Sequence, residues 1–544
     1  MRTLENSVLS TMMRTPLTLS HLLERAGKIF PTSEIVTRMP DRSLHRYTYA
    51  DFYRRSRALA EALQKAGMQP GDRVATLSWN TSAHLEAYFG IPVAGGVLHT
   101  LNLRLHPTDI AYIINHAEDR FLIVDDVLIK LYEAIKDHIN VEKVIVVPLT
   151  GKPVPEGLTS YEDFLATATG DFSYPDLPED TALGMCYTSG TTGKPKGVLY
   201  SHRSMILHSL GSALPDALNL GQSDVLTPVV PMFHVMAWGL PFTGIMVGCK
   251  IAMPGPHLDA VNLLDLYESE QVSKTAGVPT IWMGVLQALQ KEPTRWTKLL
   301  PMEMVVGGAA APEAMIRAYD TFNLKVVHAW GMTEMSPLGT VSRIKQNLAG
   351  SDPDILYALR ACQGMPMPMV EVRAMNEHGE VPWDGHTMGE LEVRGPWVAQ
   401  SYFKQESERD KWSADGWFRT GDVVTISSEG YVKITDRTKD LIKSGGEWIS
   451  SLDLENLLMG HPAVREAAVI AVTHPRWDER PLAAIVLKEG ASVTTEELRS
   501  YLEPKVAKFW IPDAFVFVDE IPRTSTGKFL KMQLRDKFKD WHWE

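Results

Sequence analysis

Several features are scarce or missing in this chain of 544 residues, and each absence narrows the range of possible functions. The three cysteines, Cys186, Cys249 and Cys362, form no CxxC pair, so we expect neither a disulfide framework nor a structural zinc site. The longest apolar stretches, such as 239–248, are shorter than the ~18 to 20 residues that a membrane-spanning helix needs. Charged residues interrupt the N-terminal segment, which therefore lacks the apolar core of a signal peptide, and we expect a cytoplasmic protein.

An excess of basic residues is missing as well. Lys and Arg total 54 against 66 Asp and Glu, and the resulting net charge of −12 argues against a dedicated nucleic-acid-binding protein. The content of 44% hydrophobic and 22% charged residues is typical of globular proteins. The chain also lacks GxGxxG, GxSxG and HExxH motifs. The HPRWD segment at 474–478 matches the HxxxD pattern of some acyltransferases, but we interpret it as a turn at the end of a strand.

Helix and strand patterns alternate in the first part of the chain. Thr48 and Asp51 have the spacing of a capping box at the start of a helix that Gly67 would end, and a buried strand is predicted at 72–79. The same alternation continues to residue 126 and favours an α/β fold with a parallel sheet. Segment 415–437 instead predicts a small antiparallel sheet, and the residues after it predict a compact strand, strand, helix, strand unit, so we place a domain boundary near Asp436.

The most informative segment is a loop rich in glycine, hydroxyl and lysine residues. Between Thr188 and Val198 it contains four hydroxyl side chains, three glycines and two lysines. Glycines allow backbone N–H groups to converge on an anion, hydroxyls add donors or a magnesium ligand, and lysines supply positive charge. Pro195 follows Lys194, so this is not a Walker A loop. A polyphosphate site is therefore predicted, with a polar surface turn as the alternative.

This loop, TSGTTGKPKG, resembles the signature loop of the adenylate-forming enzymes, the superfamily of acyl-CoA synthetases, peptide-synthetase adenylation domains and luciferases. Further motifs follow in the family's order and span the chain from Thr188 to Lys528. They are PMFHVMAWG at 231–239, MEMVVGGAAAP at 302–312, WGMTE at 330–334, TGD at 420–422, DRTKDLIKSGGEWIS at 436–450 and PRTSTGK at 522–528.

The resemblance implies a role for individual residues. ATP phosphates would be bound by the loop residues Thr188, Ser189, Gly190, Thr191, Thr192, Gly193, Lys194 and Lys196. The rest of the nucleotide would contact Gly308, His328, Ala329, Trp330, Thr333, Asp422, Arg437, Lys439 and Lys443. The carboxylate substrate would lie at His234, Trp238, Gly307 and Gly308. Coenzyme A would pass Ser444, Gly445 and Gly446, with Glu479 near it. Trp448 would reach the nucleotide, and Glu447 beside it is a further cofactor-binding residue.

Four residues would take part directly in the chemistry. They are Lys528 as the adenylation lysine, His234 beside the α-phosphate, and Glu334 with Thr188 at Mg²⁺. Mg²⁺ on ATP phosphates needs only one or two protein oxygens, so this pair suffices chemically. Lys439 would be the hinge about which the C-terminal domain rotates.

Each motif also has an ordinary explanation when it is read alone. Thr333 and Glu334 could cap a helix, and the glycine pair at 307–308 could form a tight turn. His234 could be a hydrogen-bonded core histidine, segment 436–450 a mobile linker, and Lys528 a solvated surface lysine. It is the agreement of all motifs in order that favours the functional interpretation.

The expected architecture is an α/β protein in two parts. Residues 1–434 would form an N-terminal adenylation domain of mixed and parallel sheets with an antiparallel, barrel-like subdomain, residues 435–440 a hinge linker, and residues 441–544 a small mobile α+β lid. By resemblance the chain is an AMP-forming acyl-CoA synthetase that uses ATP, Mg²⁺ and coenzyme A, and relatives suggest a homodimer.

The resemblance is strongest to bacterial medium- and long-chain fatty-acyl-CoA synthetases and, most narrowly, to 3-methylmercaptopropionate-CoA ligases. We therefore expect 3-(methylthio)propionate as substrate, with short- and medium-chain fatty acids as the alternative. Two other classes stay open: an enzyme that loads a carrier protein, and a nucleotide-binding protein without catalysis.

Overall fold

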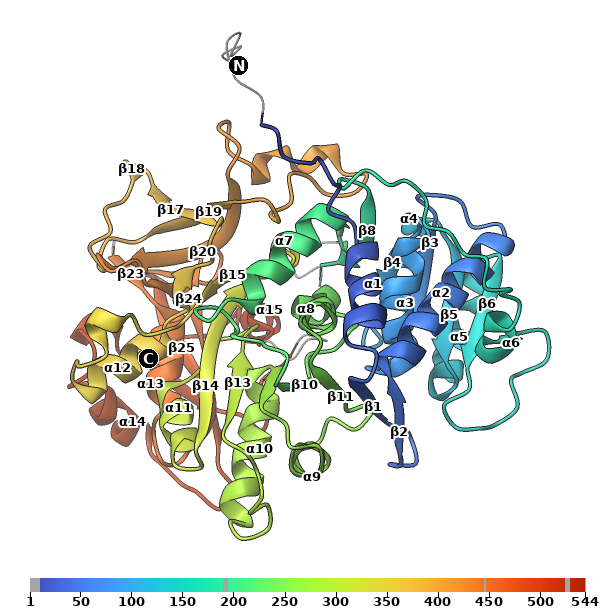
Figure 1. Ribbon diagram of the computed structural model, residues 1–544. Helices are drawn as coiled ribbons and strands as arrows, with labels where there is room; N and C mark the ends of the chain where they lie inside the picture. Colours follow the sequence, from blue (N-terminus) through green and yellow to red (C-terminus); the bar gives the residue numbers. More distant parts are fainter. Residues whose placement is uncertain (1–9, 189–193, 445–446, 524–528, 544) are drawn as a thin grey trace.

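Two mixed β-sheets flanked by helices make up most of the molecule (Figure 1). The computed structural model describes residues 10–188, 194–444, 447–523 and 529–543. Within these residues the larger sheet has nine strands in the order β16-β15-β14-β13-β12-β10-β11-β1-β2, and its central strands run parallel. Its strands are β1 (Glu34–Arg38), β2 (Leu44–Thr48), β10 (Val225–Pro228), β11 (Lys250–Met253), β12 (Lys274–Gly277), β13 (Met302–Val306), β14 (Leu324–Gly331), β15 (Leu338–Val341) and β16 (Met365–Pro366).

The second large sheet is mostly parallel, and only β9 runs antiparallel to its neighbour among the described residues. Its order is β7-β6-β5-β3-β4-β8-β9. The strands are β3 (Arg73–Leu77), β4 (Val97–Thr100), β5 (Asp119–Asp125), β6 (Lys143–Val147), β7 (Thr159–Ser160), β8 (Ala182–Tyr187) and β9 (Gly197–Ser201). The parallel sheet that the sequence pattern predicted is therefore confirmed.

An antiparallel sheet follows in the chain, as the turn-rich sequence predicted. It pairs β18-β17-β19-β20-β21. Its strands are β17 (Glu371–Asn376), β18 (Gly379–Glu380), β19 (Gly389–Arg394), β20 (Phe418–Ile426) and β21 (Val432–Arg437). Because β20 and β21 are neighbours in this sheet, Asp422 lies opposite Arg437.

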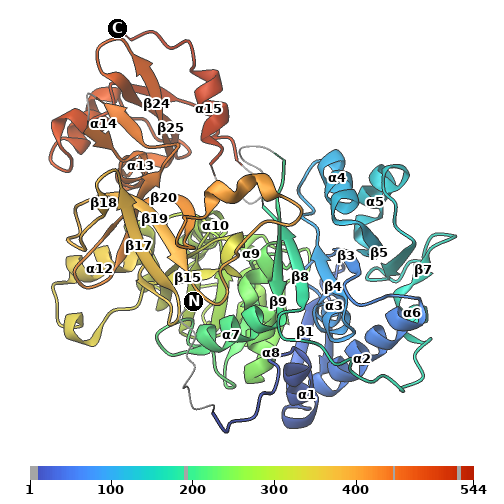
Figure 2. The same ribbon diagram turned by 90° about the horizontal axis from the view of Figure 1, so that it is seen from above.

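The C-terminal unit has its own sheet, which stands apart from the seven-stranded sheet in Figure 2. The strands are β22 (Ile442–Ser444), β23 (Glu447–Ile449), β24 (Val464–His474), β25 (Asp478–Leu487) and β26 (Ala514–Phe517). Among the described residues, each hydrophobic cluster lies either at or before Ile434 or at or after Ile442. The region around the expected hinge thus contributes little to either core.

Helices pack against the sheets. Those of the larger part are α1 (Ser20–Ile29), α2 (Tyr49–Lys65), α3 (Ser82–Val93), α4 (Pro107–Ala117), α5 (Ile129–Ile135), α6 (Tyr161–Leu165), α7 (His202–Ala213), α8 (Leu240–Val247), α9 (Ala260–Glu270), α10 (Pro279–Lys291), α11 (Glu313–Asp320) and α12 (Pro353–Ala361), and those of the C-terminal unit are α13 (Ser451–Met459), α14 (Thr495–Leu502) and α15 (Lys531–Lys537). Over the described ranges, none of these helices has the length and hydropathy that crossing a bilayer requires.

Local predictions can be compared with these elements. The capping box is confirmed: the Thr48 side chain accepts a hydrogen bond from the Asp51 backbone N–H, and the Asp51 carboxylate accepts one from the Thr48 backbone. The turn at 474–478 is also confirmed, because the His474 Nδ1 accepts hydrogen bonds from the backbone N–H groups of Arg476 and Trp477 between β24 and β25. The alternative of a helix cap at Thr333 is wrong, since a single 3-10 turn without a side-chain cap follows β14.

Candidate functional site

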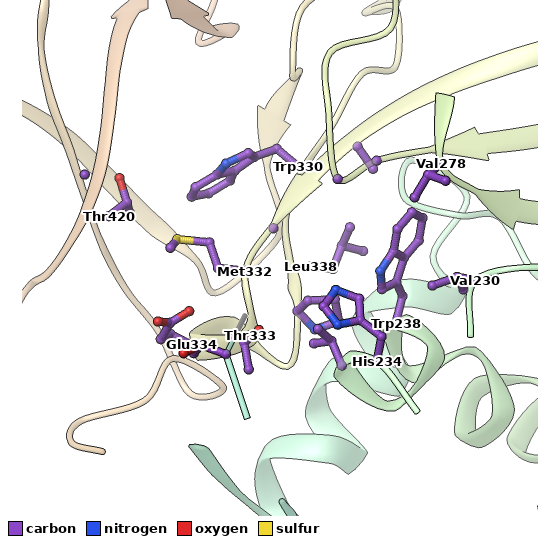
Figure 3. A pocket seen from close by; sticks show the side chains of 18 of the residues that line it. Val230, His234, Trp238, Val278, Trp330, Met332, Thr333, Glu334, Leu338 and Thr420 are labelled. Carbon is purple, nitrogen blue, oxygen red and sulfur yellow. The ribbon is translucent and has the colours of Figure 1, made fainter. Parts of the chain in front are cut away.

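A cavity of about 430 Å³ lies at the carboxyl ends of the parallel strands β10, β12 and β13 and beside the end of β14. In α/β folds, ligands bind at this edge because the loops that follow the strands converge there. Figure 3 shows two different sides of the cavity: Glu334, Thr420 and Trp330 lie on one, and Trp238 lies beside Val230 and Val278 on the other. We call these the polar half and the acyl half.

The lysine-rich loop closes a hairpin between β8 and β9. The Thr188 backbone N–H donates to the Lys196 carbonyl at 2.9 Å, and the Lys196 N–H donates to the Thr188 Oγ1 at 3.2 Å. Thr188, Lys194 and Lys196 all line the cavity. Residues 189–193, which the resemblance assigned to phosphate binding, lie outside the described residues. The hairpin therefore brings one hydroxyl and two ammonium groups to the polar half.

Both lysines of the loop contact other parts of the chain. The Lys196 Nζ lies 2.5 Å from the Glu408 Oε2 and 5.2 Å from the centre of the Tyr402 ring. The Lys194 Nζ lies 4.9 Å from the centre of the Tyr112 ring. Ion pairs that keep contact with water are worth about 0–1 kcal/mol, and both of these side chains are partly exposed, so an anionic ligand can compete with Glu408 for Lys196.

A buried carboxylate fixes the aromatic wall of the polar half. The Trp330 Nε1 donates to the Asp422 Oδ2 at 2.9 Å, and the Arg437 Nε lies 3.1 Å from the Asp422 Oδ1. Asp422 is only 2% exposed, and its carboxylate raises the pKa of Arg437. Trp330 and Arg437 line the cavity, whereas Asp422 lies behind them. This arrangement holds an indole ring where a planar nucleobase can stack on it.

Glu334 supplies the carboxylate of the polar half. Its Oε1 accepts a 2.6 Å hydrogen bond from the Tyr402 hydroxyl, and the Glu334 backbone carbonyl accepts one from the Ala399 N–H. Burial and the neighbouring Glu334 raise the pKa of Tyr402, which therefore remains a hydrogen-bond donor at neutral pH. Thr333 directly precedes Glu334 in the chain, and the Thr333 backbone carbonyl accepts a hydrogen bond from the Tyr200 hydroxyl. Glu334 and Thr188 both line the cavity, and each carries an oxygen atom of the kind that binds Mg²⁺ together with phosphates.

The acyl half is built on an unusual turn. Val235, Met236, Ala237 and Trp238 have φ angles between 45° and 57°, and Gly239 continues the turn at 73°. This left-handed conformation costs roughly 1–2 kcal/mol per residue with a Cβ, so the surrounding packing must impose it. A Cβ at Gly239 would lie 2.6 Å from the His208 ring. The turn points Trp238 toward the cavity, with His234 at its start.

Two glycines make room for this indole and for a ligand beside it. A Cβ at Gly307 would lie 3.0 Å from the Trp238 ring, and Gly308 has a φ of 82°. Both glycines follow β13 and line the cavity. The glycine pair therefore forms a turn and also lets a ligand approach the backbone, the two explanations that the sequence left open. With Val230, Val278 and Ile281, Trp238 forms an apolar wall that suits an alkyl or thioether chain.

Some predicted residues lie elsewhere. The His328 side chain is buried in β14, where its Nδ1 lies 2.9 Å from the Ala361 carbonyl oxygen, and burial lowers the pKa of His328 to about 4. Among the described residues that line the cavity His328 is absent, whereas Ala329 and Lys439 are present. Lys528, Gly445 and Gly446 lie outside the described residues.

The described cofactor-binding residues expected from position 443 onward belong to the C-terminal sheet. Glu447 and Trp448 are in β23, and Trp448 is exposed. The Glu479 Oε2 accepts a 2.8 Å hydrogen bond from the Lys443 backbone N–H, and the Ser444 Oγ lies 3.0 Å from the Arg480 Nη1. In this structure Glu479 therefore anchors the backbone of β22.

Sequence reasoning missed several residues of the cavity. Arg104, Tyr402, Lys411 and Arg419 line it, as do apolar residues such as Phe233. Arg104 lies shortly after strand β4, and a charged residue that follows a parallel strand could have been predicted to lie near the ligand. Tyr402 had none, because its partner Glu334 lies 68 residues earlier in the chain.

Comparison with known proteins places this geometry in a family. The sequence pattern of the AMP-binding enzyme matches residues 23–403, and that of the AMP-binding enzyme C-terminal domain matches residues 453–528. A long-chain-fatty-acid–CoA ligase of Thermus thermophilus is 47% identical, with 99% of this chain and 98% of that protein covered. A 3-methylmercaptopropionyl-CoA ligase of Ruegeria pomeroyi is 44% identical, with 98% and 99% covered.

A solved structure agrees over the same length. ATP-bound MatB from Rhodopseudomonas palustris is 26% identical and has a TM-score of 0.81, with 97% of this chain and 99% of that chain covered. The pattern match extends over more than half of the chain, and the relatives are similar along nearly all of it. The chain belongs to the AMP-binding enzyme family.

Proposed function

We propose that this protein is an AMP-forming acyl-CoA synthetase, which joins a carboxylic acid to coenzyme A and converts ATP to AMP and pyrophosphate. The observation that carries the proposal is the single cavity with a polar and an acyl half, between which His234 lies in Figure 3. Such a cavity can hold a nucleotide phosphate and an apolar acid next to each other. The names of the 47% and 44% identical relatives, both CoA ligases, support the same reaction.

The first half-reaction activates the acid. A carboxylate oxygen attacks the α-phosphorus of ATP, the bond from that phosphorus to the bridging oxygen breaks, and pyrophosphate leaves. Lys194 and Lys196 lie where they can neutralise the phosphates, and Trp330 where it can stack on adenine. Lys528 is assigned by resemblance to the charge that develops on the α-phosphate.

Thr188 and Glu334 would hold Mg²⁺, which when bound neutralises phosphate charge. Their oxygens fit this ion, since Mg²⁺ on phosphates takes one or two protein ligands and water. The hydrogen bond from Tyr402 leaves the second carboxylate oxygen of Glu334 available and fixes the orientation of the group.

The second half-reaction transfers the acyl group. The coenzyme A thiol attacks the acyl carbonyl carbon and loses its proton. The bond from that carbon to the phosphate oxygen of AMP breaks, and AMP leaves. We propose that residues 441–544 rotate as a lid about 435–440, with Lys439 as the pivot, so that Lys528 withdraws and coenzyme A enters near Ser444. The separate hydrophobic clusters on either side of the hinge support this division.

For the acid we propose 3-(methylthio)propionate, with short- and medium-chain fatty acids as alternatives. The apolar wall at Trp238 and Val230 suits a short thioether chain. A pocket discriminates chains that differ by one methylene by only about 1–3 kcal/mol, so activities on neighbouring acids should overlap.

The test is a panel of carboxylates assayed for pyrophosphate and AMP with and without free coenzyme A. It should include the thioether acid, butyrate, hexanoate and octanoate. Thioester and AMP formed only with free coenzyme A support the ligase. AMP without thioester would favour an enzyme that loads a carrier protein, and no nucleotide turnover would favour a binding protein. The homodimer stays a prediction, which a sedimentation measurement of the molecular mass in solution would test.

A further inference from the structure

Asn80 joins the two large sheets beside the acyl half of the cavity. It follows β3 of the seven-stranded sheet and is 2% exposed. Its backbone carbonyl accepts a 3.1 Å hydrogen bond from the Gly255 N–H, just beyond β11 of the other sheet. Its side chain crosses to the loop 229–232 that follows β10, also in the nine-stranded sheet.

The Asn80 side chain uses both amide hydrogens and its oxygen on the end of β10 and the loop that follows it. The Nδ2 donates to the carbonyls of Pro228 at 2.8 Å and Val230 at 3.0 Å, and the Oδ1 accepts from the Met232 N–H at 2.7 Å. The partners fix the orientation of the amide, because two carbonyls require donors and a backbone N–H requires an acceptor. The isosteric aspartate has no donors when ionised and cannot reproduce this set.

The loop that Asn80 holds leads directly into the substrate site. Val230 is part of the apolar wall beside Trp238, and Pro231, Phe233 and His234 also line the cavity. The three hydrogen bonds of the Asn80 side chain go to this loop and to the last residue of β10, Pro228. The groups of the polar half are anchored separately, through Asp422, Tyr402 and the β8–β9 hairpin.

We propose that Asn80 is a positioning residue that sets the acyl half of the cavity and thereby the affinity for the carboxylate, while the groups that hold the adenine and the outer phosphates are anchored independently of it. This inference rests on the proposed function. Buried polar networks of this kind hold a backbone in one geometry because an unmatched carbonyl or N–H in the interior is unfavourable. The expected signature is therefore a change in KM for the acid without a matching change in KM for ATP.

The test compares Asn80→Ser, Asn80→Ala and Asn80→Asp with the parent protein. Serine retains one donor, alanine none, and aspartate places a carboxylate against two carbonyls. We expect KM for the carboxylate to rise in this order, by roughly tenfold or more for alanine, with KM for ATP unchanged within about twofold. Equal changes in both constants, or no change in either, would overturn the proposal. The serine variant keeps the test decisive if the aspartate variant does not fold.

Asn115 provides a control for the same amide-to-carboxylate change at an exposed position outside the cavity. Its Nδ2 donates to the His138 carbonyl and its Oδ1 accepts from the Asn140 N–H, but it lies on α4 and is absent from the described lining of the cavity. Asn115→Asp should leave the ratio of the two KM values unchanged. Thermal-shift titrations with ATP and with the carboxylate measure the same split without turnover. A parent protein that binds both ligands but forms no AMP would contradict the proposed function and leave the Asn80 comparison intact.

Discussion

The two halves of the cavity are built in different ways. In the polar half, charged and aromatic side chains are held by partners distant in sequence, such as Asp422 by Trp330 and Arg437, and Glu334 by Tyr402. In the acyl half, the shape depends on backbone, namely the left-handed turn at 235–239 and the loop that Asn80 holds. The polar half therefore depends on charge, and the acyl half on packing, which predicts different consequences of mutation.

The largest expected effect concerns Lys528, which we assign to the adenylation step alone. Lys528→Ala removes a charge that stabilises the developing phosphate, so acyl-AMP formation should fall by about 10²–10³-fold. Thioester formation from supplied acyl-AMP should stay near the parent rate. Measuring the two half-reactions separately checks this, and an equal loss of both would contradict the assignment.

The next effect sharpens the comparison on the polar side. Asp422→Asn keeps an acceptor for Trp330 but removes the charge that faces Arg437. Hydrogen bonds to charged groups are worth about 1.5–3 kcal/mol, so KM for ATP should rise roughly 10- to 150-fold with little change for the acid. Steady-state kinetics with each substrate varied would measure this. Asp415→Asn is the control, because Asp415 is 58% exposed and its pair with Arg373 lies on the surface.

A smaller and opposite pattern is expected on the acyl side. Trp238→Ala removes the wall above Gly307, so kcat/KM for butyrate should fall roughly tenfold, as a loss of about 1–3 kcal/mol implies. Octanoate should lose less, since longer chains fill the space, and KM for ATP should be unchanged. The exposed Trp383 gives a control variant, Trp383→Ala. A uniform loss over all acids would break the proposed division of the cavity.

The smallest effect tests the pair of Lys196 and Glu408. Glu408→Gln frees the ammonium group for phosphate, and a pair of this exposure is worth at most about 1 kcal/mol. KM for ATP should therefore fall by no more than about fivefold. Glu118→Gln, which breaks the pair with Lys404 at 2.6 Å, is the matched control. A rise in KM for ATP would show that Glu408 supports the loop.

The polar half has a local sequence signal for a physical reason. Phosphate binding needs a local concentration of glycine, hydroxyl and lysine residues, which the segment from Thr188 to Lys196 displays within a few positions. The alternation of helix and strand patterns likewise indicated parallel strands that bring such loops to one edge. Trp330, which donates to Asp422, is 92 residues away from it, however, and no local pattern reveals such a contact.

The backbone conformation of the acyl half had no comparable local signal, although the resemblance named His234, Trp238, Gly307 and Gly308, which all line the cavity. The left-handed turn contains Val235, Met236, Ala237 and Trp238, residue types that ordinarily avoid positive φ, so tertiary packing overrides their preference. Asn80 is a single amide in an apolar strand end, and its three partners lie about 150 residues later in the chain. His328 shows the reverse case: the resemblance placed it at the nucleotide, but its side chain bonds to Ala361.

The most direct test of the central claim follows an oxygen atom. A carboxylate labelled with ¹⁸O is incubated with the protein, ATP, Mg²⁺ and coenzyme A, and the nucleotide product is examined by mass spectrometry. If the acid attacks the α-phosphorus inside this cavity, AMP will carry one labelled oxygen and will equal the thioester in amount. Unlabelled AMP, or ADP with labelled phosphate, would contradict the account.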